Sequence, residues 1–313
     1  MKIIAATDLT DGSRRVVDLA LEIAAATGAE LDLCHVVDLP PEPSPLETRS
    51  EVEPALEALR ARVRERVEKA SAALEEERRR CAERGVECRT RLVEGHPWEA
   101  VIEEATRAQA ALLVVGPHGS NAPTVLREAI RERLLGSTAD RVVRHAPCPV
   151  LVATGDRPIG NMRGSKWLVG VDFSPASRAA VQLARKLAEP AGAQLVLTHT
   201  VPPTGLPEDD TREPTWRQLL REESRKQAEA ELRSLAADEG GGADIHQGER
   251  ASYGPPAEEL CRAASETSAD LLVLGSHGKK GLTRLLLGST AERCLRRADI
   301  PVLVVKPADT GAA

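Results

Sequence analysis

The second half of the sequence contains a glycine pattern that suits the binding of phosphate groups. Two glycines are followed after nine residues by a third, and the pattern comprises Gly275, His277, Gly278, Gly288, Ser289 and Thr290. Glycines let backbone amides approach an anion closely, and a helix that begins at Ser289 directs free amides at the same anion. The alternative, that these glycines only form tight turns, stays open. The pattern lacks the Gly-Lys-Ser/Thr ending of a Walker loop, which argues against a P-loop NTPase.

An aspartate follows the first apolar segment in each half. Asp172 lies in VGVDFSPASR, and Asp8 has the equivalent position in the first half. In open α/β sheets, ligands bind beyond the carboxyl ends of the strands. Ser174 and Pro175 already provide a helix N-cap and a first helical residue, so Asp172 remains available for an amine or hydroxyl of a ligand. Thr10 is the corresponding capping residue beside Asp8.

Four histidines accompany these motifs. His35 and His199 end the second apolar segment of each half, a position typical of a structural histidine, whereas His118 and His277 lie within the glycine motifs. A ring at the latter positions either contacts a phosphate or orders the loop. Because the sequence places no carboxylate or nucleophile beside them, we predict no catalytic residue and no protein metal site.

The first half carries a longer version of the glycine pattern. Gly116 and Gly119 are present, but 16 residues rather than nine precede Gly136 and Ser137. The seven additional residues resemble two helical turns, which either loop out from a phosphate site or reshape and cover it. Basic residues lie in both loops, namely Arg127, Arg131, Arg133, Lys279, Lys280 and Arg284.

The two halves of the chain are copies of each other. Residues 136–153 and 288–305 share 11 of 18 residues at an offset of 152 positions. The offset is 159 at the glycine motifs and 164 at the aspartates, so loop insertions separate the copies. The chain is therefore a tandem duplication.

Each copy alternates apolar segments with helical segments. The apolar segments Ala111–Val115 and Leu271–Leu274 have no polar face, which is typical of parallel strands that are covered on both sides. We expect an α/β fold of two doubly wound domains, each a five-stranded parallel sheet with helices on both faces. After the long amphipathic helix of each copy, an alternating strand is expected, at Cys88–Val93 and at Asp244–Gln247.

Composition sets the domain boundaries and limits the classes of function. We assign 1–153 to the first domain, 154–165 to an aperiodic linker, 166–307 to the second domain and 308–313 to a tail.

With 42 Lys+Arg, 48 Asp+Glu and only five aromatic residues, the sequence argues against nucleic-acid binding. No membrane span or signal peptide is evident. Six cysteines without metal-ligand spacing predict reduced thiols and a cytoplasmic location.

Together, the strand-end Asp and His, Gly-x2-Gly-x9-Gly-Ser and the terminal Pro-Val-Leu-Val-Val resemble the universal stress protein family, twice over. The resemblance covers the chain apart from linker and tail. It implies a Rossmann-like sheet of order 3-2-1-4-5, ATP binding where the glycine pattern is present, and dimerisation through the last strand. Here Pro149–Ala153 and Pro301–Val305 are expected to pair within one chain, which leaves a homodimer optional.

The resemblance also implies roles for individual residues. In the second domain Asp172 would contact adenine or ribose, the backbone at Thr200 would line the adenine pocket, and the phosphates would be held by Gly275, Gly278, Gly288 and Ser289. Mg²⁺ would arrive with the nucleotide. In the first domain the equivalent positions are Asp8, Val36, Gly116, Gly119, Gly136 and Ser137. Since its loop has the family's length, the second domain is expected to hold the main site.

The expected function is regulatory binding of ATP, ADP or AMP in a stress response. Nucleotide occupancy would change the loop around 276–287, and an unknown protein partner would read the change. Two alternatives are a slow ATPase or phosphotransferase, and a protein-interaction module that binds no nucleotide.

Overall fold

The computed structural model describes residues 1–38, 53–119, 135–157, 160–202, 215–238, 246–278 and 287–307. The first domain comprises β1 (Lys2–Ala6), a 3₁₀ turn (Asp11–Ser13), α1 (Arg14–Thr27), β2 (Glu30–Val37), α2 (Glu53–Glu83), β3 (Cys88–Glu94), α3 (Pro97–Arg107), β4 (Leu112–Val115), α5 (Ser137–His145) and β5 (Val150–Val152). The second comprises β6 (Lys166–Gly170), α6 (Pro175–Ala191), β7 (Gln194–Val201), α7 (Thr215–Asp238), β8 (His246–Tyr253), α8 (Pro256–Glu266), β9 (Leu271–Gly275), α9 (Ser289–Arg297) and β10 (Val302–Val305).

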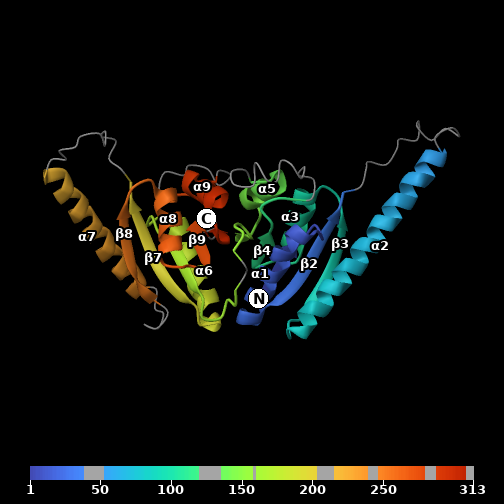
Figure 1. Ribbon diagram of the computed structural model, residues 1–313, viewed down its shortest axis with the longest axis horizontal. Helices are drawn as coiled ribbons and strands as arrows, with labels where there is room; N and C mark the ends of the chain where they lie inside the picture. The colour runs from blue at the N-terminus through green and yellow to red at the C-terminus, as the bar shows by residue number, and fades with distance from the viewer. Residues whose placement is uncertain are drawn as a thin grey trace, which may run out of the picture.

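All strands join one sheet, whose order is β3-β2-β1-β4-β5-β10-β9-β6-β7-β8. Each domain contributes five parallel strands in the order 3-2-1-4-5, which confirms the expected fold. The last strands of the domains, β5 and β10, pair antiparallel in the centre, with Leu151 opposite Leu303. The expected pairing within one chain therefore merges the two sheets, and the domains lie side by side with α2 and α7 at the outer ends (Figure 1).

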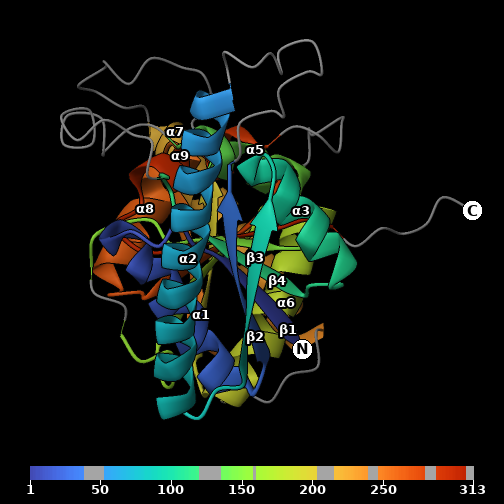
Figure 2. The ribbon, with the colours of Figure 1, turned by 90° about the vertical axis from the view of Figure 1, so that its right-hand side faces the viewer.

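Helices cover both faces of this sheet. One core contains side chains of α1, α2, α6 and α7, and the other contains side chains of α3, α5, α8 and α9. Viewed from the end of the first domain, α2 and α3 lie on opposite sides of β3 (Figure 2). Both cores are continuous across the two domains, because the central strands contribute apolar side chains to each face.

The strand at the outer edge of the second domain, β8, differs from the one predicted. We expected a strand at Asp244–Gln247, whereas β8 runs from His246 to Tyr253. Its sequence, HQGERASY, has no apolar alternation, because an edge strand has one paired side and needs less burial. Hydropathy therefore underestimates its length.

The segment between the domains is packed against both of them. Met162 is 2% exposed, and Arg163 donates a hydrogen bond of 3.0 Å to the carbonyl of Ala25 in α1. Arg157 donates a hydrogen bond of 3.0 Å to the carbonyl of Ala269 in the second domain. The described residues of this linker thus contact both domains.

Gly155, at the start of this linker, is predicted to be intolerant of any side chain. Its φ is +73°, and a Cβ atom there would overlap the carbonyl of Asp299. Gly164 has a similar φ of +71°, but a Cβ atom there would meet nothing within 4 Å. Gly164→Ala should destabilise by about 1 kcal/mol from backbone strain alone. Gly155→Ala should destabilise by about 2–4 kcal/mol because overlap adds to strain. Equal losses in urea unfolding would contradict this account of the junction.

Candidate functional site

A cavity of about 710 Å³ lies at the carboxyl edge of the sheet in the first domain. Its volume is within the range of small-molecule sites. All six residues predicted for this domain line it, namely Asp8, Val36, Gly116, Gly119, Gly136 and Ser137. Because β1 and β4 are neighbours whose connections leave in opposite directions, the cavity occupies the position where doubly wound folds bind ligands.

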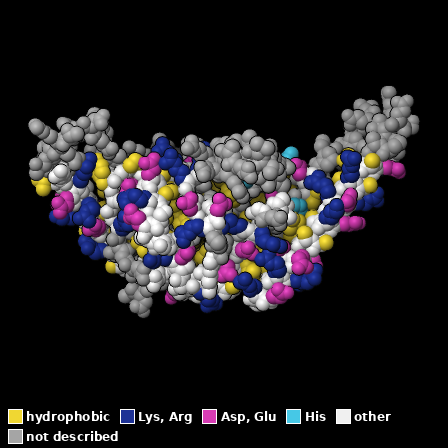
Figure 3. Space-filling view, in the orientation of Figure 1, with side chains coloured by type: hydrophobic (Ala, Val, Ile, Leu, Met, Phe, Trp, Pro, Cys, Tyr) yellow, Lys and Arg dark blue, Asp and Glu magenta, His cyan; other side chains and the backbone are white. Residues whose placement is uncertain are grey.

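Helices from both faces of the sheet form its walls. On one side lie Arg66, Lys69, Ala70 and Ala73 of α2, and on the other lie Pro97 and Val101 of α3 with Val142 of α5. Sequence reasoning missed the two basic residues, because α2 reads as a helix with a solvated polar face. Figure 3 shows why, since Lys, Arg, Asp and Glu side chains are interspersed along α2. Lys69, for instance, donates a hydrogen bond of 2.7 Å to Glu65.

The two candidate aspartates begin similar turns in the two domains. Asp8 Oδ1 accepts hydrogen bonds from the amide (3.1 Å) and the hydroxyl (2.6 Å) of Thr10. Asp172 Oδ1 accepts a hydrogen bond of 3.0 Å from the amide of Ser174. The residue after each aspartate, Leu9 or Phe173, has a positive φ near 60° (59° and 62°). One carboxylate oxygen therefore stabilises its own turn in each domain.

The helices that follow these aspartates begin differently. In the second domain Ser174 is the N-cap, its hydroxyl accepting from the Ser177 amide at 3.2 Å, and Pro175 is the first helical residue, as predicted. In the first domain a 3₁₀ turn intervenes, and Ser13 occupies the N-cap position of α1. The prediction that Thr10 caps this helix is wrong, because the 3₁₀ turn Asp11–Ser13 separates Thr10 from the start of α1.

The strand-end histidines hold these turns against the sheet. His35 Nδ1 lies 2.8 Å from the carbonyl oxygen of Thr7, and His199 Nδ1 lies 2.7 Å from that of Val171. Each contact joins the second strand of a domain to the residue that precedes the aspartate. The His199 ring also packs against Phe173, with 4.9 Å between ring centroids. The geometry supports the structural role expected for both histidines.

The glycine motifs close in the same way in both domains. The amide of Gly288 donates a hydrogen bond of 2.7 Å to the Ser276 carbonyl, and that of Gly136 donates one of 2.8 Å to the Pro117 carbonyl. A Cβ atom on Gly288 would lie 3.1 Å from the Cα of His277, so a side chain there would require the loop to shift by a few tenths of an ångström. Ser289 and Ser137 are the first residues of their helices, which places α9 and α5 with their amino ends at the loops.

The second domain brings its aspartate and glycine loop together. A Cβ atom on Gly278 would lie 2.5 Å from Asp172 Oδ2, so the backbone of this glycine passes directly over the carboxylate. Gly275 is packed equally closely against α6, where a Cβ atom would lie 2.8 Å from the Ser177 amide nitrogen. His277 Nδ1 lies 2.9 Å from the Ser276 hydroxyl. The basic residues predicted for the loops and the seven-residue insertion fall outside the described residues, as does the tail.

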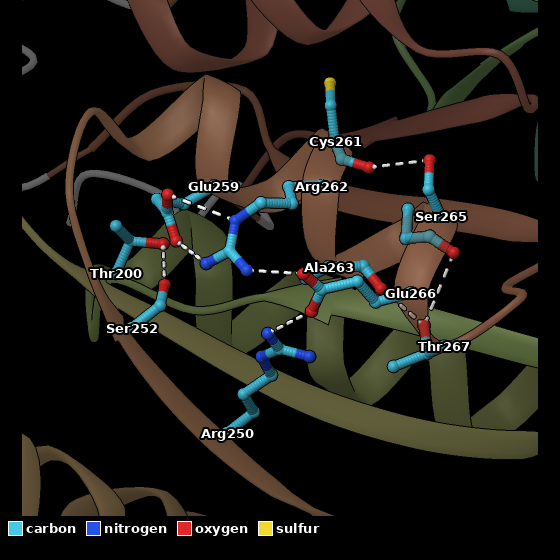
Figure 4. A network of polar contacts seen from close by, with 11 residues as sticks. Thr200, Arg250, Ser252, Glu259, Cys261, Arg262, Ala263, Ser265, Glu266 and Thr267 are labelled. Atoms are coloured by element: carbon cyan, nitrogen blue, oxygen red, sulfur yellow. Dashed lines mark hydrogen bonds and ion pairs between the residues drawn. The ribbon is translucent and has the colours of Figure 1, made fainter.

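Thr200, the predicted adenine-side residue, is buried at the end of β7. Its hydroxyl lies 3.3 Å from that of Ser252 on β8, next to a group of ion pairs between β8 and α8 (Figure 4). In this group Glu266 is paired with Arg250 and Arg262. Hydrogen bonds from Arg250 and then Arg262 lower the pKa of Glu266. These ion pairs link α8 to β8 at the surface of the second domain.

The described residues contain no group of three or more His, Cys, Asp or Glu side chains that could hold a metal ion. Nor does any helix within the described ranges combine the length and the apolar character needed to span a bilayer.

Comparison with known proteins identifies the family. The model of the universal stress protein family matches residues 1–154 and again residues 165–306. The chain belongs to this family. A universal stress protein of Mycobacterium tuberculosis is 33% identical over 233 residues, which is 72% of this chain and 71% of that protein. One of Mycolicibacterium smegmatis is 34% identical over 204 residues, 63% of this chain and 62% of the relative.

Solved structures of the family have the same fold over the full length. The universal stress protein of Archaeoglobus fulgidus has a TM-score of 0.66 at 20% identity, and the match covers 98% of both chains. A putative universal stress protein of Pseudomonas aeruginosa has a TM-score of 0.64 at 20% identity, with 98% of this chain and 94% of that chain covered. Both matches extend over the two domains of this chain.

The histidine contact gives a prediction for stability. His199→Ala removes one hydrogen bond and one ring contact, and should lower the free energy of unfolding by about 1–2 kcal/mol. His96→Ala is the matched control, because His96 is exposed before α3 and makes no capping hydrogen bond. Urea unfolding followed by circular dichroism measures both. If the two variants were equally stable, the histidine would not hold the turn.

Proposed function

We propose that this universal stress protein binds an adenine nucleotide at the carboxyl edge of its sheet and acts as a nucleotide-dependent regulator. The main support for the proposal is the cavity of the first domain. It is lined by Asp8, by Val36 near the end of β2 and by the residues of the glycine pattern. The second domain repeats these groups, with Asp172 against Gly278.

The phosphate end of the site would be formed by a loop and a helix. Gly136 and Ser137 line the cavity at the start of α5, and no side chain caps this helix in the part of the chain that the structure describes. Its first amides are therefore available to a phosphate, which also benefits from the positive end of the helix dipole. The same arrangement occurs at Gly288 and Ser289 of α9.

The nucleoside end would lie over β1 and β2. Asp8 Oδ1 is used by its own turn, which leaves Oδ2 to accept a ribose or adenine hydrogen bond. Val36 provides backbone groups and an apolar side chain at the end of β2. Such a mixture of few polar groups and apolar walls is typical of small-molecule sites. In the second domain Asp172 and Thr200 have these positions.

Both domains are included in the proposal, for different reasons. Loop length favours the second domain as the main site, because nine residues separate Gly278 from Gly288. The described geometry favours the first domain, where the cavity is lined by all the predicted residues. Mg²⁺ would be held by the phosphates of the nucleotide rather than by a protein cluster. A protein partner would then distinguish the occupied loop from the empty one.

An added carboxylate at the start of each helix tests the proposal without weakening the helices. Acidic residues in the first turn stabilise a helix through its dipole, but they repel a phosphate. Ser137→Asp and Ser289→Asp should each lower the affinity of their own domain for ATP with Mg²⁺ at least tenfold, which corresponds to about 1.4 kcal/mol. Isothermal titration calorimetry of the full chain measures the affinity and the number of sites.

Ser224→Asp is the control, because Ser224 is exposed on α7. It should bind ATP as the unmodified protein does, and each single variant should retain the site of the other domain. Undetectable binding of ATP, ADP and AMP by the unmodified protein would overturn the proposal. Undiminished affinity in the double variant would show that the nucleotide binds elsewhere.

A further inference from the structure

Two of the six cysteines meet between helices α8 and α9 of the second domain. Cys294 is fully buried, and its Sγ lies 3.9 Å from the carbonyl oxygen of Ala257. Within a regular α-helix, the carbonyl of Ala257 accepts the amide of Cys261, four residues later. The Cys294 sulfur therefore lies at the turn of α8 that carries Cys261. Cys261 also packs against the apolar cluster that contains Cys294 and Ala257, close enough for a hydrogen bond between the thiols to affect the pKa of each.

Cys261 is the more solvent-accessible thiol of the pair, and its pKa is the one that is lowered. Cys261 is only partly buried, whereas Cys294 is 0% exposed. The hydrogen bond from Cys294 lowers the pKa of Cys261 and raises that of Cys294. Arg297 next to Cys261 lowers this pKa further, while burial and the carboxylates of Asp299 and Glu258 oppose it. A thiolate that solvent reaches, beside a buried second thiol, is the arrangement in which cysteines oxidise reversibly.

We propose that Cys261 and Cys294 form a peroxide-sensitive thiol pair that closes to a disulfide between α8 and α9. The pair lies on α8 and α9 of the second domain, and the sulfur of Cys261 faces away from the ion pairs of α8, as Figure 4 shows. The substrate is a small hydroperoxide such as hydrogen peroxide, which can reach a partly buried sulfur.

The chemistry proceeds in two displacements. The Cys261 thiolate attacks one oxygen of hydrogen peroxide, the O–O bond breaks, and the leaving hydroxide takes up a proton to form water. Cys261 is then a sulfenic acid. Cys294 attacks its sulfur, the S–O bond breaks, and hydroxide leaves with the Cys294 proton as a second water. Two thiols and one peroxide thus give one disulfide and two waters.

The other four cysteines provide internal controls. Cys34 and Cys148 are buried, and burial raises the pKa of these thiols to about 12 and about 11. They should stay reduced. Cys81 and Cys88 are a second neighbouring pair, in which Cys81 is buried and Cys88 partly buried, and the peptide map distinguishes a link between them from one between Cys261 and Cys294.

The test is peroxide treatment of the reduced full chain, followed by unfolding, alkylation and peptide mass mapping. The expected product is a linked peptide pair containing Cys261 and Cys294, lighter than the reduced pair by about two hydrogen masses. Cys294→Ser should abolish the link and let dimedone trap the sulfenic acid on Cys261. If Cys294→Ser does not fold, Cys294→Ala replaces it, and the map of the unmodified protein is decisive by itself.

Several outcomes would overturn the proposal. Full alkylation of Cys261 and Cys294, under conditions that oxidise free dithiothreitol, would show that the pair is inert. Formation of sulfinic acid on Cys261 in the unmodified protein, without a linked peptide, would show that Cys294 does not reach it. Oxidation of Cys34 or Cys148 at the same rate would show that reactivity follows unfolding rather than this geometry.

Discussion

The antiparallel pairing of β5 with β10 is the contact on which the arrangement of the molecule depends. It joins Val150, Leu151 and Val152 to their partners in β10, and all of these side chains are buried. Without it, each domain would expose an apolar strand edge, which is a site of aggregation. The edges that remain, β3 and β8, carry arginine residues and little apolar surface, as exposed edges require.

The same pairing places the two candidate phosphate helices next to each other. α5 and α9 flank the central strands, and Arg144 of α5 lies 3.8 Å from Glu292 of α9. Lys306, which follows β10, donates hydrogen bonds of 2.8 Å and 2.6 Å to the carbonyls of Arg144 and Ala146 at the end of α5. Thr154 occupies in the first domain the position that Lys306 has in the second. Its hydroxyl donates a hydrogen bond of 2.6 Å to the carbonyl of Ile300. Each domain therefore holds the carboxyl end of the other domain's helical segment.

The sequence predicts what periodic or duplicated patterns determine. Apolar segments locate the buried strands, and the repeat links Asp8 with Asp172. Features that depend on contacts distant in sequence are not predictable in this way. Cys261 and Cys294 are 33 residues apart, and no spacing rule marks them as neighbours. Arg66 is a cavity residue only because α2 packs beside β2 and extends to the strand ends. Nothing in its local sequence distinguishes it from the solvated residues of the same helix.

The charged residues near the two candidate sites differ although the turns match. Arg91 Nε lies 3.8 Å from Asp32 and 3.5 Å from Glu104, and both carboxylates are almost fully buried near Cys34, which lines the first-domain cavity. The oxygens of Asp32 have no hydrogen-bond partner among the described residues, so this burial is unfavourable.

In the second domain the repeat offsets of 164 and 159 place Val196 and Ala263 at these positions. Arg250, the counterpart of Arg91, is instead paired with the exposed Glu266. Since a low dielectric strengthens the interactions of such a cluster, the first domain carries buried charge near its cavity that the second domain lacks at the equivalent positions. The two domains therefore offer a ligand the same backbone turns over different electrostatic surroundings, and equal affinities are not expected.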